Sequence, residues 1–331
     1  MTKPMAKRTK IGIIGCGWIA DKMAITLQGT PQAEAYAIAS RDINKAKSLA
    51  EQYNFQKAYG SYEELLADDN VELVYIATPH SHHYEHARMA LLAGKHVLCE
   101  KAFTATTWQA EELIALAREK NLFITEAIWT RYMPLSQTIN EILASGIIGT
   151  PKLLSANLCY PIGNRERLQK PELAGGALLD LGVYALNFAA MVFGTDIVKT
   201  TSCCTMLPTG VDGQNSITLQ YADGKIAILH SSCMVMSDRM GIISGEKGHL
   251  IVENINNPER VRVVTTDYKE VAVYEAPTKI TGYEYQVYAS IEAIENGWLE
   301  SPYMPHKETI RIMQQMDDLR KEWGIKYPAD R

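Results

Sequence analysis

Cysteine is scarce in this sequence and follows no ligand-like spacing. The 331 residues include six cysteines but no CxxC pair, which predicts neither a zinc site nor a disulfide framework in a chain of this length. The cysteines are Cys16, Cys99, Cys159, Cys203, Cys204 and Cys233. Reduced thiols of this kind are typical of a cytoplasmic protein, and this is the location we expect.

A concentration of basic residues is also missing. The 33 Lys and Arg are outnumbered by 38 Asp and Glu, giving a net charge of −5, and this argues against nucleic acid as a partner. No apolar run approaches the roughly 18 residues needed to cross a bilayer, so we expect no membrane partner. The charged residues up to Lys10 lead into a strand pattern rather than the apolar core of a signal peptide.

Strand and helix patterns alternate over residues 1–128. Strand-like apolar runs occur at 10–14, 33–40, 73–78, 96–99 and 123–126. Helix-like segments lie between them, at 18–28, 44–53, 62–67, 84–93 and 107–120. This alternation predicts βαβ units, and therefore an α/β domain with a doubly wound parallel sheet of the Rossmann type.

The pattern changes in the second domain that we expect over residues 129–331. A helix pattern at 176–193 precedes a series of strand-like runs, at 200–206, 215–221, 225–232, 240–244, 249–253, 260–265 and 270–275. Turn pairs such as Asp223-Gly224 predict hairpins and a mainly antiparallel sheet. Helix patterns at 284–296 and 307–323 close an α+β domain.

A glycine-rich element of the form G-x-G-x-x-A follows the first strand and opens a helix. Its glycines allow a tight turn and close approach to a pyrophosphate, which the helix N-terminus attracts. An ordinary strand-to-helix turn is the alternative, but the strand–turn–helix context favours dinucleotide binding. The expected cofactor-binding residues here are Gly15, Cys16, Gly17, Trp18, Ile19 and Ala20.

The end of the second strand discriminates between the two nicotinamide nucleotides. A site for NAD usually places a carboxylate there to bind the ribose 2′-hydroxyl. This chain has Ser40 and Arg41, which suit a 2′-phosphate, followed by Asp42. We therefore expect NADP, with NAD as the alternative because of Asp42 and because an arginine here also suits a solvated surface.

Candidate catalytic residues lie in two segments. Lys101 follows the fourth strand, at the sheet edge where such folds bind ligands. Asp180 and Tyr184 are four residues apart and would share a helix face. A tyrosine near an ammonium group can exchange the proton of a substrate hydroxyl, because the cation favours the phenolate. An exposed strand-end lysine and a packed tyrosine are the structural alternatives.

These motifs resemble the Gfo/Idh/MocA family of glucose–fructose oxidoreductases and inositol dehydrogenases. Within it the sequence looks closest to the branch of dimeric trans-dihydrodiol dehydrogenases and NADP-dependent D-xylose dehydrogenases. The similar segments follow the family's order over nearly the whole chain, at 15–20, 40–42, 58–65, 97–101, 126–131, 175–184 and 300–306.

The resemblance implies roles for further residues. It implies a large open sheet in the second domain, whose exposed face commonly forms a homodimer or higher oligomer. It places Lys101 in a Glu-Lys-Pro element, although Ala102 replaces the proline here, and Tyr184 at the acid/base position. Additional cofactor-binding residues are Thr78, His80, His83, Glu100, Trp129 and Arg131, and the substrate candidates are Tyr160 and Arg165.

The histidines around His83 invite a metal hypothesis. His82 and His86 are four residues apart and would share a helix face, as zinc ligands can. No Cys or carboxylate at a fixed spacing completes a ligand set, so we expect no metal. The segment instead matches the family's Thr-Pro-x-x-x-His stretch along the cofactor.

Together these features predict an NADP-dependent oxidoreductase. It would transfer a hydride between the nicotinamide and a hydroxyl-bearing carbon of a sugar, polyol or dihydrodiol substrate. Two alternatives stay open: a non-catalytic NAD(P)-binding regulator on the same fold, and an NAD-dependent inositol or sugar dehydrogenase.

Overall fold

The computed structural model describes residues 7–331, which form two compact units. Unit 1 comprises Met1–Ala127 and Lys279–Met313, and unit 2 comprises Ile128–Thr278 and Gln314–Arg331. The first six residues lie outside the described part. The domain boundary expected after residue 128 stays a prediction.

Unit 1 is built on a parallel sheet with the strand order β3-β2-β1-β4-β5-β6. The doubly wound parallel sheet predicted from the alternating pattern is therefore confirmed. Strands β1 and β4 are apolar and almost wholly buried, as expected for central strands covered on both faces. The strands are β1 (Thr9–Ile14), β2 (Ala33–Ala39), β3 (Lys57–Tyr59), β4 (Leu73–Ile76), β5 (His96–Glu100) and β6 (Ile124–Ala127).

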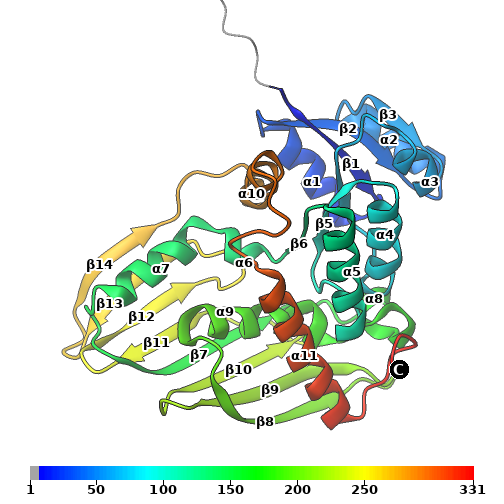
Figure 1. The fold of residues 1–331 in the computed structure, drawn as a ribbon. Coiled ribbons are helices and arrows are strands. Elements are labelled where there is room, and N and C mark those ends of the chain that lie inside the picture. Colours follow the sequence, from blue (N-terminus) through cyan, green and yellow to red (C-terminus); the bar gives the residue numbers. More distant parts are fainter. Residues whose placement is uncertain (1–6) are drawn as a thin grey trace, which may run out of the picture. The chain divides into compact units, whose positions relative to one another are not determined.

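Helices connect these strands. The strand order runs in opposite directions from β1, and right-handed crossovers therefore place α1 on one face and α4 and α5 on the other. Figure 1 shows α4 and α5 side by side. The helices of unit 1 are α1 (Trp18–Gln28), α2 (Ile43–Gln52), α3 (Tyr62–Leu66), α4 (His80–Leu92), α5 (Thr107–Lys120) and α10 (Glu284–Glu295).

Unit 2 carries an eight-stranded sheet in the order β14-β13-β12-β11-β7-β10-β9-β8. Only the β7–β10 pair is parallel among the strand pairs of this described sheet, so the mainly antiparallel prediction is confirmed. The strands are β7 (Pro151–Cys159), β8 (Ile197–Met206), β9 (Asp212–Tyr221), β10 (Ile226–Ser232), β11 (Gly241–Gly245), β12 (Gly248–Glu253), β13 (Arg260–Thr265) and β14 (Glu270–Glu275).

One face of this sheet is covered by helix α9, which packs on β7 and β10 (Figure 1). On the other face side chains are exposed, and β10 alternates buried Ala227 and Leu229 with exposed Ile228 and His230. The helices are α6 (Trp129–Tyr132), α7 (Pro134–Ala144), α8 (Glu166–Gln169) and α9 (Val183–Phe193). A 3₁₀ turn lies at Pro171–Leu173 and a π-helical turn at Leu178–Gly182. Helix α11 (His306–Trp323) begins in unit 1 and ends in unit 2.

The segment Pro171–Phe193 is long and apolar enough to cross a membrane, contrary to the expectation that no run approaches that length. However, 83% of its most apolar window is buried inside the protein. It is a core helix, and its hydropathy reflects burial against the sheet of unit 2.

Candidate active site

The glycine-rich loop forms an open cradle at the end of β1. Gly15 has a φ of +107°, and a Cβ there would lie 2.7 Å from the carbonyl oxygen of Ala77, so only glycine fits. A Cβ at Gly17 would meet no atom within 4 Å. The first turn of α1 has no side-chain cap on its amides. This open backbone at a helix N-terminus fits a pyrophosphate.

The residues after β2 divide into two roles. Asp42 is the N-cap of α2, and its Oδ1 accepts a hydrogen bond from the amide of Asn44 at 3.0 Å. Ser40 is buried, and its Oγ accepts from the amide of Asp42 at 3.2 Å. Arg41 is exposed and lies near Tyr62 and His86: its charge opposes the rise in the pKa of Tyr62 that burial causes, and adds to the fall in the pKa of His86 that burial causes. The carboxylate is therefore engaged in a helix cap, while the guanidinium is accessible.

His83 lies between the two loops that follow β4 and β5. Its Nε2 is 2.8 Å from the carbonyl oxygen of Thr78, and its Nδ1 is 2.8 Å from that of Ala102. Burial and the nearby Lys101 charge lower the pKa of His83 to about 4, although the two carbonyls oppose this shift. This shift favours the neutral form of the ring, in which one nitrogen donates to its carbonyl.

The other histidines of this segment lie on α4, which begins at His80 rather than at residue 84 as expected. Nδ1 of His86 is 3.0 Å from Oγ1 of Thr78, and its ring stacks on that of His82. Burial lowers the pKa of His86 to about 4. No group of three or more His, Cys, Asp or Glu side chains in residues 7–331 is arranged to hold a metal ion.

Two charged residues, Glu100 and Lys101, lie at the end of β5 and directly after it. Glu100 is buried and accepts a hydrogen bond from the hydroxyl of Tyr75. Lys101 is half-buried, and the peptide bond between Lys101 and Ala102 is cis. Because Lys101 directly follows β5, it lies at the carboxyl edge of the parallel sheet, where such folds bind ligands.

The helix that carries Asp180 and Tyr184 begins with a turn that is not α-helical. Leu178–Gly182 is a π-helical turn, and α-helical geometry begins only at Val183. A common face for Asp180 and Tyr184 was predicted from α-helical spacing. That spacing is wrong for the first turn of the helix, which contains Asp180. Turns of this kind occur frequently at functional sites. Both side chains are buried, with exposed fractions of 3% and 6%.

Asp180 forms a two-bond ion pair with Arg167 of α8. Nη1 donates to Oδ1 at 2.8 Å, and Nη2 donates to Oδ2 at 3.1 Å. A paired, buried carboxylate is held in a single orientation. Arg167 carried no sequence signal, because its partner lies on a different element.

Trp129 and Arg131 lie on α6, in unit 2. Nε of Arg131 donates to Oδ1 of Asn187 at 2.6 Å, which ties α6 to α9. Trp129 is half-buried. Both belong to a different unit from the glycine-rich loop, and their assignment to the cofactor stays a prediction.

Tyr160 lies in a polar cluster at the end of β7. Its hydroxyl accepts hydrogen bonds from Arg239 at 3.0 Å and from Asn256 at 3.5 Å, and the Arg239 guanidinium is 5.4 Å from the ring centroid. Sequence analysis missed Arg239 and Asn256, which reach Tyr160 only through the order of strands in the sheet. Arg165 is an exposed residue before α8.

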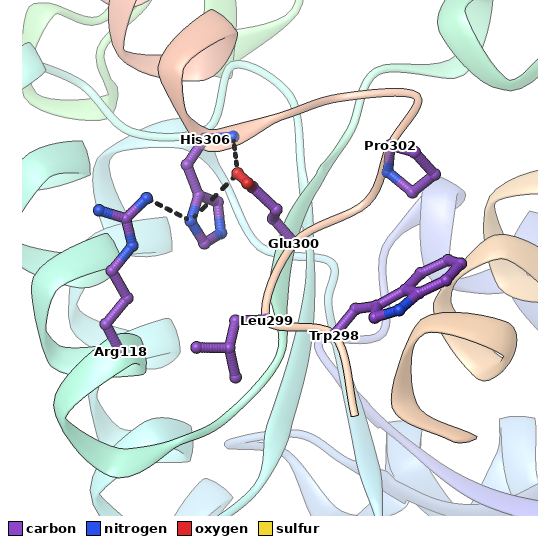
Figure 2. Close-up of a pocket in the computed structure, with 6 residues that line it drawn as sticks. All are labelled: Arg118, Trp298, Leu299, Glu300, Pro302 and His306. Carbon is purple, nitrogen blue, oxygen red and sulfur yellow. Dashed lines mark hydrogen bonds and ion pairs between the residues drawn. The ribbon is translucent and has the colours of Figure 1, made fainter. Parts of the chain in front are cut away.

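Unit 1 has a pocket of about 440 Å³ (Figure 2). Glu300 Oε2 accepts from the amide of His306 at 2.6 Å, and Nε2 of His306 lies 2.9 Å from the carbonyl of Ile124. Because Ile124 begins β6, the pocket lies at the amino edge of the sheet, opposite to the glycine-rich loop. Its lining residues are Arg118, Trp298, Leu299, Glu300, Pro302 and His306.

Two family models match the chain. Residues 9–127 match the oxidoreductase family with an NAD-binding Rossmann fold, and residues 136–251 match the GFO/IDH/MocA C-terminal domain. The chain belongs to the Gfo/Idh/MocA family. The family resemblance, the enzyme class and the nicotinamide nucleotide expected from the sequence are thereby confirmed.

Relatives of known activity match nearly the full length. The trans-1,2-dihydrobenzene-1,2-diol dehydrogenases of Mus musculus and Homo sapiens are 34% and 33% identical, covering 97% of this chain and 98% of each relative. KijD10, a 3-ketoreductase from Actinomadura kijaniata crystallised with NADP and TDP-benzene, has 26% identity and a TM-score of 0.87, covering 95% of this chain and 98% of its own. Levoglucosan dehydrogenase, with 16% identity and a TM-score of 0.86, shares the fold.

Proposed function

We propose that this member of the Gfo/Idh/MocA family is an NADP-dependent dehydrogenase or reductase. Its substrate is a small sugar, polyol or trans-dihydrodiol that reacts at a hydroxyl-bearing carbon. The observation that carries the cofactor preference is the engagement of Asp42 as the N-cap of α2. With Oδ1 held in the cap, this carboxylate has less capacity for the ribose 2′-hydroxyl, whereas exposed Arg41 suits a 2′-phosphate.

The cradle after β1 fits the nucleotide. Gly17 leaves open space for a pyrophosphate, and the uncapped amides of α1 face negative charge favourably. The remaining proposed contacts come from Thr78 in the loop after β4, His83 on α4, and Glu100 at the end of β5. When bound, the nicotinamide accepts or supplies the hydride, and the protein's contribution is placement and electrostatics.

The proton chemistry falls to side chains of this protein. Tyr184 exchanges the proton of the reacting hydroxyl, and the ammonium of Lys101 stabilises negative charge on that oxygen. Asp180, held by Arg167, orients the substrate or the Tyr184 turn of the helix. Trp129, Arg131, Tyr160 and Arg165 are the further candidates for contact with nicotinamide or substrate.

The relatives support a small hydroxylated substrate. Those of about 34% identity are named for a dihydrodiol, and the ketoreductase was crystallised with a TDP compound. The polar group formed by Tyr160, Arg239 and Asn256 offers hydrogen bonds to several hydroxyls.

We also propose that the protein is a homodimer through the eight-stranded sheet. Its uncovered face carries apolar side chains in neighbouring registers: Leu153 and Ile228 are each 41% exposed, and Ile242 and Ile251 are half-buried. A sheet face with several exposed apolar side chains is typical of an interface between copies.

A substrate screen tests the proposal. The purified protein is incubated with trans-dihydrodiols, aldoses, polyols and inositols, each with NADP⁺ and with NAD⁺, and nicotinamide absorbance is followed. We expect turnover with at least one class and a preference for NADP⁺. Nucleotide binding without turnover on any compound, with the ketone and dicarbonyl counterparts also inert with NADPH, would contradict it.

A further inference from the structure

Two distant parts of unit 2 hold the backbone just before the helix that carries Asp180 and Tyr184. One is Asp212, the first residue of β9. The other is Tyr327, in the segment between α11 and the C-terminus (Figure 1). Both act on the short stretch from Gly175 to Leu178.

Asp212 serves the N-terminus of this helix. Its Oδ2 accepts hydrogen bonds from the amide of Leu178 at 2.9 Å and from Nδ2 of Asn215 at 2.8 Å. The amide of Ala177 also stabilises its charge. Asp212 is fully buried, and a carboxylate at this position satisfies amides that the helix itself leaves unpaired.

The Asp212 carboxylate also packs closely against the backbone at Gly176. Gly176 has a φ of +111°, and a Cβ there would lie 2.3 Å from Oδ1 of Asp212. The chain of hydrogen bonds continues from Asn215 to Ser231, whose Oγ donates at 3.0 Å. A Cβ at Gly182 would lie 3.1 Å from that same Oγ. The polar chain therefore borders both ends of the turn that contains Asp180.

Tyr327 binds the backbone at Gly175, three residues before the π-helical turn begins at Leu178. Its hydroxyl donates to the carbonyl oxygen of Gly175, and its side chain is only 4% exposed. The guanidinium of Arg320 lies 4.2 Å from the ring centroid. Arg320 pairs with Asp317 at 2.6 Å and with Asp330 at 2.9 Å. The end of the chain is thus locked onto the start of the helix.

Burying a carboxylate such as Asp212 lowers the stability of the folded protein relative to an apolar residue. Burial raises the pKa of Asp212 to about 6, although its hydrogen bonds from Asn215, Leu178 and Ala177 oppose the shift. A buried carboxylate costs folding free energy that an apolar residue of similar size would not. Its presence at the start of this helix, in place of an apolar residue, points to a requirement for one defined backbone geometry.

We propose that Asp212 and Tyr327 are positioning residues, which set the π-helical turn so that Asp180 and Tyr184 are correctly placed for the reaction. This inference rests on the proposed function, in which Tyr184 exchanges the substrate proton. A displacement of about 1 Å in a reacting group can lower a rate by roughly 100-fold. The C-terminal segment therefore contributes to catalysis without touching substrate.

The test compares Asp212→Ala, Asp212→Asn and Tyr327→Phe in the full-length protein. Asn retains an oxygen for the amide of Leu178, so it should restore most of the activity that Ala loses. Asp196→Asn and Tyr268→Phe are matched controls, because both residues are exposed. The readouts are kcat, KM, NADPH affinity, circular dichroism, and hydrogen exchange of the amides from Ala177 to Tyr184.

We expect Asp212→Ala and Tyr327→Phe to lower kcat by about 10- to 100-fold, with NADPH affinity unchanged and faster exchange in the 177–184 amides. Asp212→Asn should stay within about threefold of the original protein. If the folded Ala and Phe variants exchange and turn over like the original, the inference is wrong. A loss of kcat that only matches the unfolded fraction also overturns it. By contrast, full activity in Tyr184→Phe would contradict the proposed function itself.

Discussion

Asp180 and Arg167 are joined by two parallel hydrogen bonds, of 2.8 Å and 3.1 Å. The Asp180 side chain is 4% exposed and the Arg167 side chain 35% exposed, so the carboxylate is buried while its cation is partly solvated. The pair links α8 to the turn that leads to Tyr184, and it therefore has consequences for both stability and rate.

Arg167→Ala leaves a buried carboxylate without its cation. We expect the free energy of unfolding to fall by about 2 kcal/mol, less than for a fully buried pair because Arg167 is partly solvated. Urea unfolding monitored by circular dichroism measures this loss. Lys152→Ala is the control, because it breaks an exposed pair with Glu246 and should cost less than about 0.5 kcal/mol. Equal losses of unfolding free energy in the two variants would show that the Arg167–Asp180 pair stabilises the protein no more than an exposed pair does.

Arg41→Ala removes the cation proposed to bind the 2′-phosphate. Charge-assisted hydrogen bonds contribute about 1.5–3 kcal/mol, so NADPH affinity should fall by roughly 10- to 100-fold. NADH lacks that phosphate, and its affinity should change by less than about threefold. Fluorescence titration measures both, with exposed Lys47→Ala as the control. A parallel loss of NADH affinity would mean that Arg41 binds another part of the nucleotide.

His83 should make the protein less stable in acid. Burial lowers its pKa from 6.5 in the unfolded chain to about 4, so the folded protein binds this proton less tightly. Stability is therefore retained above about pH 6.5 and is lost as the pH falls from there towards about 4, by up to about 3 kcal/mol. His86 acts in the same direction, whereas the raised pKa of Asp212 acts in the opposite one.

The measurement is the free energy of unfolding at several pH values for the original protein and His83→Gln. Because glutamine does not titrate, the variant should lose less stability between about pH 6.5 and about pH 4 than the original protein does. Parallel curves for the two proteins would show that His83 is already protonated in the folded state.

Ile228→Asp places a charge on the uncovered face of the eight-stranded sheet. If this face joins two copies, a buried unpaired charge should weaken the dimer by at least about 10-fold, which light scattering after size exclusion detects. Leu92→Asp is the control, because Leu92 is 50% exposed on α4 of unit 1. A dimer unaffected by Ile228→Asp would place the interface elsewhere.

The sequence predicted regular elements well where one periodicity dominated. Helices Trp18–Gln28 and Thr107–Lys120 and strand Arg260–Thr265 have the predicted bounds. Strand β3 was missed because its three residues are only partly buried and carry no alternating pattern. The segment 133–150 received no assignment, although it contains α7.

Structural features that depend on residues far apart in the chain could not be predicted from the sequence. The apolar pattern at 176–193 indicated one helix, but its first turn is a π-helix bordered by Asp212 and Ser231, which lie on the sheet beneath it. Likewise, the sequence does not reveal that Asp42 caps α2 through Oδ1, an observation that bears on the proposed preference for NADP. Motifs locate candidate residues, whereas hydrogen-bond partners decide what remains available to a ligand.

The most direct test of the central claim is kcat for Tyr184→Phe with the substrate found in the screen, measured together with NADPH affinity. General acid–base catalysis contributes about 10²- to 10⁴-fold, so we predict a fall in kcat of at least about 100-fold with unchanged NADPH affinity. Turnover at the original rate in the folded, NADPH-binding variant would contradict the account, because Tyr184 would then have no part in the proton transfer.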